Sequence, residues 1–267
     1  MKSMCRTAAC VAALCLTSAA ASAADGVQIA ERTTVDGTPQ TNQVMIAKDR
    51  MRAEIPDPMS GAKQTIIFDG TRQVIDIVNM ERKTYVEVTK AELDQLGAQM
   101  HDMMGQMQAA MASMPPTQRA QMEAMMRGRG MGPLMGSGVK TEYRKSGTNR
   151  VGQWTCDTYE GSQNGQKVSE VCTVDPAAIG LAAAEVATVQ QLATFFNKLI
   201  PEGAGMMDIG RPEEQGFSGL PIRTSTTLRG KTVTNEITGV NRQALDDSLF
   251  QVPAGFQKQD FPGGMGK

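Results

Sequence analysis

Soft metal ligands gather in one stretch of this 267-residue chain. Thioether sulfur and imidazole nitrogen atoms are ligands that favour Cu(I). The residues that would supply them are Met100, His101, Met103, Met104, Met107, Met122, Met125 and Met126. His101 is the single histidine, and on a helix it lies about 100° around the axis from its neighbour Met100. The pattern therefore admits a Cu(I) site, and it also admits an exposed histidine on the flank of a helix.

The same stretch contains an apolar face at helical spacing. Its members follow one another in steps of three or four and are Leu93, Leu96, Met100, Met103, Met107, Met111 and Met114. Eleven of the 18 methionines beyond residue 23 lie between Met100 and Met135. Because flexible thioethers pack against many apolar shapes, three interpretations stay open: ordinary packing against a sheet, an adaptable lid over an apolar ligand, and Cu(I) binding.

Residues for catalysis are sparse. A nucleophilic triad needs a general base, and His101 has no Ser or Cys partner in a recognisable elbow. Carboxylates at Asp69 and at Asp246-Asp247 occur where turns are expected. The glycines between residues 128 and 138 follow no strand and lack the Lys-Ser/Thr of a phosphate-binding loop. We therefore expect a non-enzymatic protein without a cofactor, unless Cu(I) binds.

Composition argues against two classes of polymer partner. Aromatic residues make up 4% of the chain, which is too few to predict a stacking platform for bases or sugars. The formal net charge is −1, and the chain has no concentrated basic stripe. We expect no nucleic-acid partner.

Residues 1–23 have the three parts of a secretion signal. A basic start is followed by an apolar run at residues 8–16 and by small residues that end at Ala23. This pattern predicts cleavage between Ala23 and Ala24. The apolar run is too short for a permanent membrane span, and no later stretch is long and apolar enough. We expect a periplasmic protein with no transmembrane segment, and lipidation at an early cysteine is disfavoured because the residue before Cys15 is leucine.

Two of the five cysteines, Cys156 and Cys172, remain after this cleavage. Residues 163–165, Gln-Asn-Gly, indicate a three-residue hairpin loop with glycine in the left-handed position. Such a loop places Ser162 opposite Gln166 and, counting back along both strands, Cys156 opposite Cys172. In an oxidising compartment this arrangement predicts a cross-strand disulfide. A zinc site is disfavoured because no further Cys or suitably spaced His completes it.

Period-two alternation predicts a mainly β fold. Six antiparallel strands are expected first, at Val27–Val35, Gln40–Ala47, Arg50–Ile55, Lys63–Phe68, Gln73–Val78 and Lys83–Val88. Later strands are expected at Val139–Lys145, in the disulfide hairpin up to Val174, at Leu220–Leu228 and Lys231–Val240, and at a closing edge over residues 249–253. All of them fit a single β-rich domain over residues 24–263.

Two helical insertions interrupt these strands. Thr89, with Glu92 three residues later, forms a capping-box pattern that opens a methionine-rich insertion over residues 89–127. Residues 128–138 contain five glycines and predict a flexible linker. A second amphipathic pattern predicts a helical insertion over residues 177–200.

Three local motifs carry a resemblance to a known group of proteins. They are "AKDRMRAEI" at Ala47–Ile55, "IIFDGTRQVIDIVNMERKTYVEV" at Ile66–Val88 and "DDSLFQVPAGF" at Asp246–Phe256. With the order of elements, they resemble an uncharacterised exported bacterial family, a domain of unknown function, related to the outer-membrane lipoprotein carrier and receptor (LolA/LolB-like) superfamily. The resemblance spans most of residues 27–260, and each motif is short.

The resemblance implies a strongly curved, open antiparallel sheet, shaped like half a barrel, with a helical lid over an apolar cavity. In the carrier a basic residue near the first motif helps to hold the lid closed, and Arg50 or Arg52 matches that position. The chain departs from the carrier in two ways, since methionines replace aromatic residues in the expected lid and strand pattern begins almost at Ala24.

The sequence thus predicts a non-enzymatic periplasmic binding protein. The expected ligand is apolar, such as a lipid, an acyl chain or a lipidated peptide, and is held between the curved sheet and the face from Leu93 to Met114. One alternative is a Cu(I)-buffering protein, and another is a structural or interaction module without a small ligand.

Overall fold

The computed structural model describes residues 23–56, 63–115, 117–119, 121, 141–197, 216–228 and 230–261. The strands are β1 Ala23–Val35, β2 Thr38–Ala47, β3 Arg50–Pro56, β4 Lys63–Asp69, β5 Val74–Asn79, β6 Thr84–Thr89, β7 Glu142–Val151, β8 Trp154–Gln163, β9 Gln166–Val174, β10 Leu220–Leu228, β11 Lys231–Asp246 and β12 Gln257–Gln259. The helices are α1 Lys90–Ser113, α3 Ala183–Asn197 and the short 3-10 helices η2 Pro176–Ile179 and η3 Asp247–Phe250.

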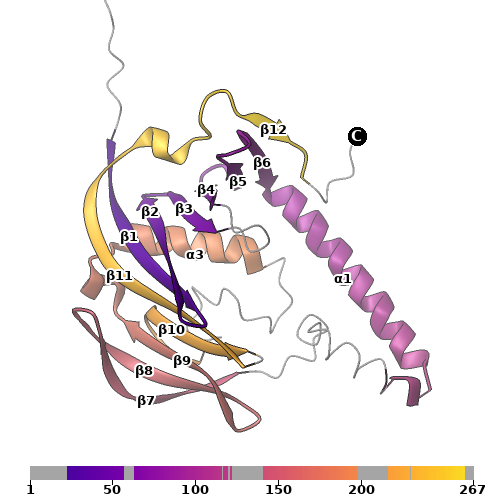
Figure 1. The fold of residues 1–267 in the computed structure, drawn as a ribbon. Helices are drawn as coiled ribbons and strands as arrows, with labels where there is room; N and C mark the ends of the chain where they lie inside the picture. The colour runs from indigo at the N-terminus through magenta and orange to yellow at the C-terminus, as the bar shows by residue number, and fades with distance from the viewer. Residues whose placement is uncertain are drawn as a thin grey trace, which may run out of the picture.

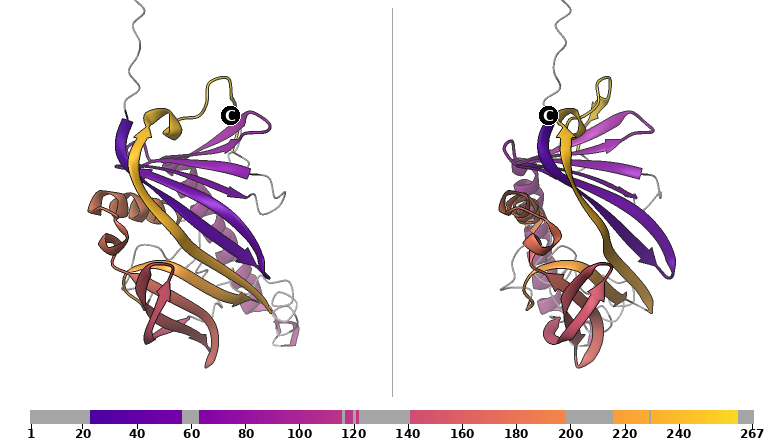
Figure 2. Two further views of the ribbon diagram at one scale, coloured as in Figure 1. Left: turned by 60° about the vertical axis from the view of Figure 1, so that its left-hand side comes forward. Right: turned by 90° about the vertical axis from the view of Figure 1, so that its left-hand side faces the viewer.

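The twelve described strands form one open sheet in the order β12-β6-β5-β4-β3-β2-β1-β11-β10-β9-β8-β7. The sheet is strongly curved, and α3 lies across its concave face (Figure 1). The right-hand view of Figure 2 shows α3, in salmon, nearly end-on beside the sheet. α1 starts directly after β6 and runs away from that end of the sheet (Figure 1). The predicted curved, mainly β fold with helical insertions is confirmed.

The first six strands follow the predicted meander closely. Turn residues and apolar positions located these strands, although β4 buries side chains on both of its faces. In β4, Ile66 and Phe68 pack on the concave face in one cluster, whereas Ile67 packs on the convex face with Val78 and Phe250. A register error by one residue would exchange these two sets, so the apolar pattern fixes the pairing.

Helix α3 joins the apolar clusters of the concave face. Its Val186 and Val189 pack against a cluster that contains Val27 and Ile46 of β1 and β2. Two turns later its Leu192 and Phe195 pack with residues of β4, β5, β6 and α1. The helix therefore lies across the middle of the curved sheet and contributes side chains to both apolar clusters of the concave face.

The disulfide between Cys156 and Cys172 is confirmed, with a Cα–Cα distance of 5.5 Å, but the predicted register is wrong. Asn164 and Gly165, with φ of 51° and 77°, form a two-residue turn that pairs Gln163 with Gln166. Asn-Gly favours this tight turn because both residues tolerate positive φ. A bulge at Gly161 and Ser162 then places Thr158 opposite Cys172, so the disulfide runs diagonally across the two strands.

The C-terminal region differs from the expected all-antiparallel sheet. Residues 247–250 form η3 instead of an edge strand, because Asp246 caps this turn by accepting a hydrogen bond from the amide of Ser248 at 2.8 Å. The closing strand comes later, as β12, and it pairs with β6 in parallel. β11 also extends beyond the predicted end at Val240, to Asp246, since it pairs along the whole of β1.

Other boundaries moved as well. The predicted second helical insertion begins with η2, and α3 itself starts at Ala183. The seventh strand runs from Glu142 to Val151, later than expected. Ala23 and Ala24, at the predicted cleavage site, are the first residues of β1 and pair with Asp246 and Leu245. Residues 1–22 of the predicted signal and the glycine-rich linker at 128–138 lie outside the described residues.

Candidate functional site

Helix α3 is fastened to the sheet at its N-terminal half. Glu185 is 3% exposed, and its carboxylate accepts hydrogen bonds from Arg242 of β11 at 2.8 and 2.9 Å. The same carboxylate accepts a hydrogen bond from the amide of Ala182 at 2.6 Å and so caps the helix. One turn later the buried Thr188 hydroxyl donates to the carbonyl oxygens of Lys48 and Ala184. These contacts hold the N-terminal half of α3 against the sheet.

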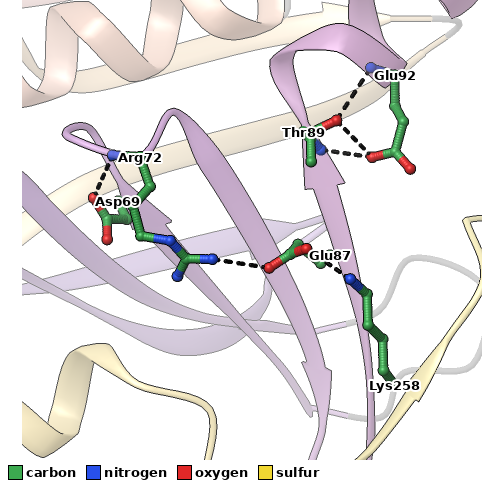
Figure 3. Close-up of polar contacts among 6 residues, drawn as sticks. All are labelled: Asp69, Arg72, Glu87, Thr89, Glu92 and Lys258. Carbon is green, nitrogen blue, oxygen red and sulfur yellow. Dashed lines mark hydrogen bonds and ion pairs between the residues drawn. The ribbon is translucent and has the colours of Figure 1, made fainter.

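Helix α1 is fastened at its first turns. The Thr89 hydroxyl accepts from the amide of Glu92 at 3.2 Å, and the Glu92 carboxylate accepts from the amide of Thr89 at 2.8 Å (Figure 3). This is the predicted capping box. The Lys90 amide also donates to the carbonyl of Gln73 in the β4–β5 turn at 3.2 Å. Leu93 is 2% exposed and belongs to the core.

A pocket of about 310 Å³ lies between these two fastened helix segments. Phe68 of β4, Leu93 of α1 and Phe195 of α3 are buried and form its apolar part. The rings of Phe68 and Phe195 meet edge to face, with centroids 5.9 Å apart. The remaining lining residues come from the exposed or half-exposed rim and are Gln73, Lys90, Asp94, Ala187, Gln190, Gln191 and Thr194. The pocket thus has an apolar floor and a polar mouth.

One wall of the mouth depends on a glycine in a predicted turn. A Cβ atom at Gly70 would lie 2.4 Å from the side-chain oxygen of Gln191 and 2.9 Å from the carbonyl oxygen of Asp49. The Gly70 amide donates to that same carbonyl at 2.8 Å. Glycine therefore allows the β4–β5 turn to lie close to α3, which is a reason for the Asp-Gly pair in the second motif.

The predicted apolar face of α1 has mixed surroundings. Of its members whose side chains the structure describes, Leu93 alone lines the pocket. Met103 is 64% exposed. The remaining described members are partly buried and are Leu96, Met107, Met111 and Met114. The side chain of Met100 lies outside the described residues.

The residues suggested for Cu(I) are also spread out. His101 and Met103 are exposed on α1, and Met107 is partly buried. The side chain of Met104 and residues Met122, Met125 and Met126 lie outside the described residues. The described residues contain no group of three or more His, Cys, Asp or Glu side chains that could hold a metal ion. Thioether coordination of Cu(I) stays a prediction.

Arg50 and Arg52, candidates for a lid latch, bind the C-terminal segment. Arg50 donates to Asp247 at 2.6 Å, and its guanidinium lies 5.0 Å from the ring centroid of Phe250. Arg52 pairs with Glu54 at 2.9 Å and donates to the carbonyl of Leu249 at 3.1 Å. Both arginines therefore hold η3 on the convex side of the sheet, where Phe250 packs in an apolar cluster with Ile67 and Val78.

A charged cluster lies on β6, at the edge that β12 covers. Glu87 accepts from Arg72 at 2.9 Å and from Lys258 of β12 at 2.6 Å (Figure 3). The hydrogen bond from Lys258, followed by that from Arg72, holds the pKa of Glu87 below its ordinary value. Asp76 is the cross-strand neighbour of Glu87 and is 7% exposed. Burial, followed by repulsion from Glu87, raises the pKa of Asp76.

The sequence did not single out the α3 side of the pocket. Gln190, Gln191 and Thr194 are ordinary solvent-facing residues in a helical pattern, and their role follows from where α3 crosses the sheet. Phe195 carried a usable signal, because a phenylalanine three residues after Leu192 extends the apolar face. No helix among the described residues is long and apolar enough to cross a membrane.

Comparisons with solved structures found distant likenesses of fold. An uncharacterised conserved protein from Thermus thermophilus matches with a TM-score of 0.43 and 10% identity, over 88% of this chain and 90% of that one. The MucA/MucB complex of Pseudomonas aeruginosa matches with a TM-score of 0.36 and 13% identity, over 87% and 57%. A LolA superfamily protein from Nitrosomonas europaea matches with a TM-score of 0.27 and 8% identity, over 86% and 90%.

Sequence comparisons give the family. A search of curated proteins found no match. The model of a domain of unknown function, DUF4412, matches residues 89–256, which contain α1, α3 and the strands from β7 to β11. Because this match covers more than half of the sequence, the chain belongs to the DUF4412 family.

Proposed function

We propose that this protein is an exported, non-enzymatic binding protein that holds a small apolar ligand in the pocket between α1 and α3. The observation that carries the proposal is the hollow of about 310 Å³ over Phe68, Leu93 and Phe195. Small-molecule sites commonly occupy about 300–1,000 Å³ and combine apolar walls with a few polar groups. This pocket matches the lower end of that range, so its ligand is small or enters with one end only.

The surroundings of the pocket support a preformed site. α3 is held through Glu185 and Thr188, and the first turn of α1 is held by its capping box. A pocket between fastened elements loses little conformational entropy when a ligand binds. The ligand class agrees with the one predicted from the sequence, while its location shifts from the Met100–Met114 face to the start of α1 and the side of α3.

A filling substitution tests the pocket. Ala187 lines it and is exposed, so Ala187→Trp would place an indole ring in the hollow with little effect on the core. We expect N-phenylnaphthylamine, a neutral fluorescent apolar dye, to bind the mature protein and to lose affinity by about tenfold or more in this variant. The matched control is Ala183→Trp, which is exposed on the same helix but lies outside the pocket lining.

Two results would contradict the proposal: no dye binding by the wild type, or equal binding by the Ala187→Trp and Ala183→Trp variants. The same titration with Met103→Asp/Met107→Asp tests the wider lid predicted from the sequence. If that variant stays folded and loses binding, the ligand extends along α1 beyond Leu93. If it binds as the wild type does, the α1–α3 pocket suffices.

A further inference from the structure

The charges at the mouth of the pocket cancel. Lys90 and Asp94 are the charged residues among its described lining. They lie one turn apart on α1, and the Lys90 Nζ atom is 2.5 Å from the Asp94 Oδ2 atom. Each side chain is half-exposed, so each charge also contacts water. The mouth therefore presents no net charge to a ligand.

The other polar groups of the mouth both donate and accept hydrogen bonds. Gln73, Gln190 and Gln191 carry amides with an acceptor oxygen and two donor hydrogens. The Thr194 hydroxyl donates to the carbonyl of Gln190 at 2.9 Å, so toward a ligand it adds an acceptor oxygen. They come from the β4–β5 turn and from α3 and face α1 across the hollow. Neutral amides and hydroxyls satisfy an uncharged polar group fully. For a full charge they provide less compensation than the water that they replace.

From these observations, and resting on the proposed function, we infer that the ligand is an amphiphile with an uncharged, hydrogen-bonding head, such as an alcohol, ester or amide. Its apolar end lies on Phe68, Leu93 and Phe195, and its head lies among the amides of the mouth. An anionic head would share Lys90 with Asp94 and be repelled by the Asp94 carboxylate, and a cationic head would share Asp94 with Lys90 and be repelled by the Lys90 ammonium.

A matched set of ten-carbon amphiphiles tests the inference. Decanamide, decanoate and decylammonium share one tail and differ in head charge, and each would compete with N-phenylnaphthylamine at neutral pH below its micelle concentration. For the wild type we expect decanamide to bind at least about tenfold more tightly than either ion.

Removing one charge at a time should change this preference in a defined direction. Asp94→Asn removes the negative charge that would repel an anionic head and keeps the charge of Lys90, so decanoate should gain affinity over decanamide by several-fold. Lys90→Gln should favour decylammonium in the same way. Asp102→Asn is the control, because Asp102 is exposed on α1 and lies outside the pocket lining. This variant should keep the wild-type order.

The failures of the two proposals are distinguishable. If decanoate or decylammonium binds the wild type as tightly as decanamide, the neutral-head inference is overturned and the pocket remains a binding site. The same holds if neither charge variant changes the order of the three ligands. If none of the three displaces the dye, both the inference and the proposed function fail.

Discussion

The two long helices that the structure describes differ in how they are held. α3 has 15 residues, lies on the concave face and joins two apolar clusters. α1 has 24 residues, and among its described side chains the contacts with the sheet are concentrated at Thr89, Lys90 and Leu93. Further along, Met103 is exposed and the described side chains are exposed or half-exposed. The longer helix is therefore the less firmly held.

This difference shows that an apolar face in a sequence does not identify its partner. The methionine face of α1 has the more regular spacing, yet α3 supplies five of the ten described residues that line the pocket. At its far end α1 has a local contact instead. The guanidinium of Arg119 donates to the carbonyl oxygens of Met111 and Ala112 at 3.0 Å each, which satisfies terminal carbonyl groups of the helix.

Hydrogen exchange should show the largest contrast between the helices. Amides of α3 that face the core, such as those of Leu192 and Ala193, should exchange through global unfolding. Amides of α1 beyond Met103 should exchange through local fraying, because isolated helices are marginally stable and Gly105 weakens this one by about 1 kcal/mol. We expect protection to differ by about a hundredfold or more. Equal protection along both helices would contradict the comparison.

Truncation of one side chain in each helix should give the next largest effect. Leu192 is 9% exposed and packs with Phe68 and Phe195, so Leu192→Ala should lower the free energy of unfolding by about 2–4 kcal/mol. Met103→Ala, at a site 64% exposed, should change it by less than about 0.5 kcal/mol. Urea denaturation measures both. A loss at Met103 as large as that at Leu192 would mean that the far half of α1 is also held.

The acidic caps of the two helices provide a smaller contrast. Glu185→Ala removes a cap and leaves Arg242 without its buried partner, so we expect a loss of about 2–3 kcal/mol. Glu92→Ala removes half of a capping box, for which about 1 kcal/mol is typical. Thermal unfolding would rank them, with Glu185→Gln as a control that keeps the shape of the side chain. A larger loss at Glu92 would reverse the assignment of α3 as the firmly held helix.

Local sequence rules predicted most of the fold because they act within a few residues. Alternation located β1 to β6, the Thr89–Glu92 pair located the start of α1, and the hairpin pattern, read with the expectation of export, located the disulfide. One error was avoidable, because the Asn164-Gly165 pair itself favours the two-residue turn that the structure contains. The bulge after this turn shifts the register of Cys156 once more, and it depends on geometry that residue spacing leaves open.

The site was less predictable than the fold for a related reason. Leu93 was found because it belongs to a helical apolar face, but Phe68, Gln191 and Thr194 meet it through long-range packing. These residues are far from Leu93 in the sequence, and nothing in the residue spacing indicates that they line the same pocket. The parallel pairing of β12 with β6 is also a long-range feature, since it depends on the ion pair of Lys258 with Glu87 and on the amide of Gln257 donating to Lys83 at 2.9 Å.

Strands β5 and β6, which precede α1, have two different faces. Ile75 and Val88 point to Leu93 in the concave cluster, whereas Asp76 and Glu87 lie on the opposite face. The Oδ1 atom of Asp76 is buried without a hydrogen-bond partner. Burial is the largest influence on the pKa of Asp76 and raises it. The charges of Glu87 and Asp69 also raise this pKa, whereas those of Arg72 and Lys258 lower it, so the net direction is upward.

The raised pKa of Asp76 predicts that β5 and β6, the strands before α1, become less stable as pH rises. A carboxyl whose pKa is higher in the folded than in the unfolded protein favours folding in its protonated form, so its stabilisation is lost as pH rises through the folded pKa. Asp76→Asn keeps the shape without the charge. It should raise the free energy of unfolding by about 1 kcal/mol at neutral pH and should flatten the pH dependence above the ordinary aspartate range.

Glu87→Gln should act in the opposite sense. Because the pKa of Glu87 is lowered in the folded protein, its carboxylate stabilises the fold until the pH falls through that pKa. Urea unfolding at several pH values measures both variants, and fluorescence of a label on α1 reports whether the change reaches that helix. A pH profile of Asp76→Asn that parallels the wild type would show that Asp76 titrates normally and that the root of α1 is insensitive to this pair.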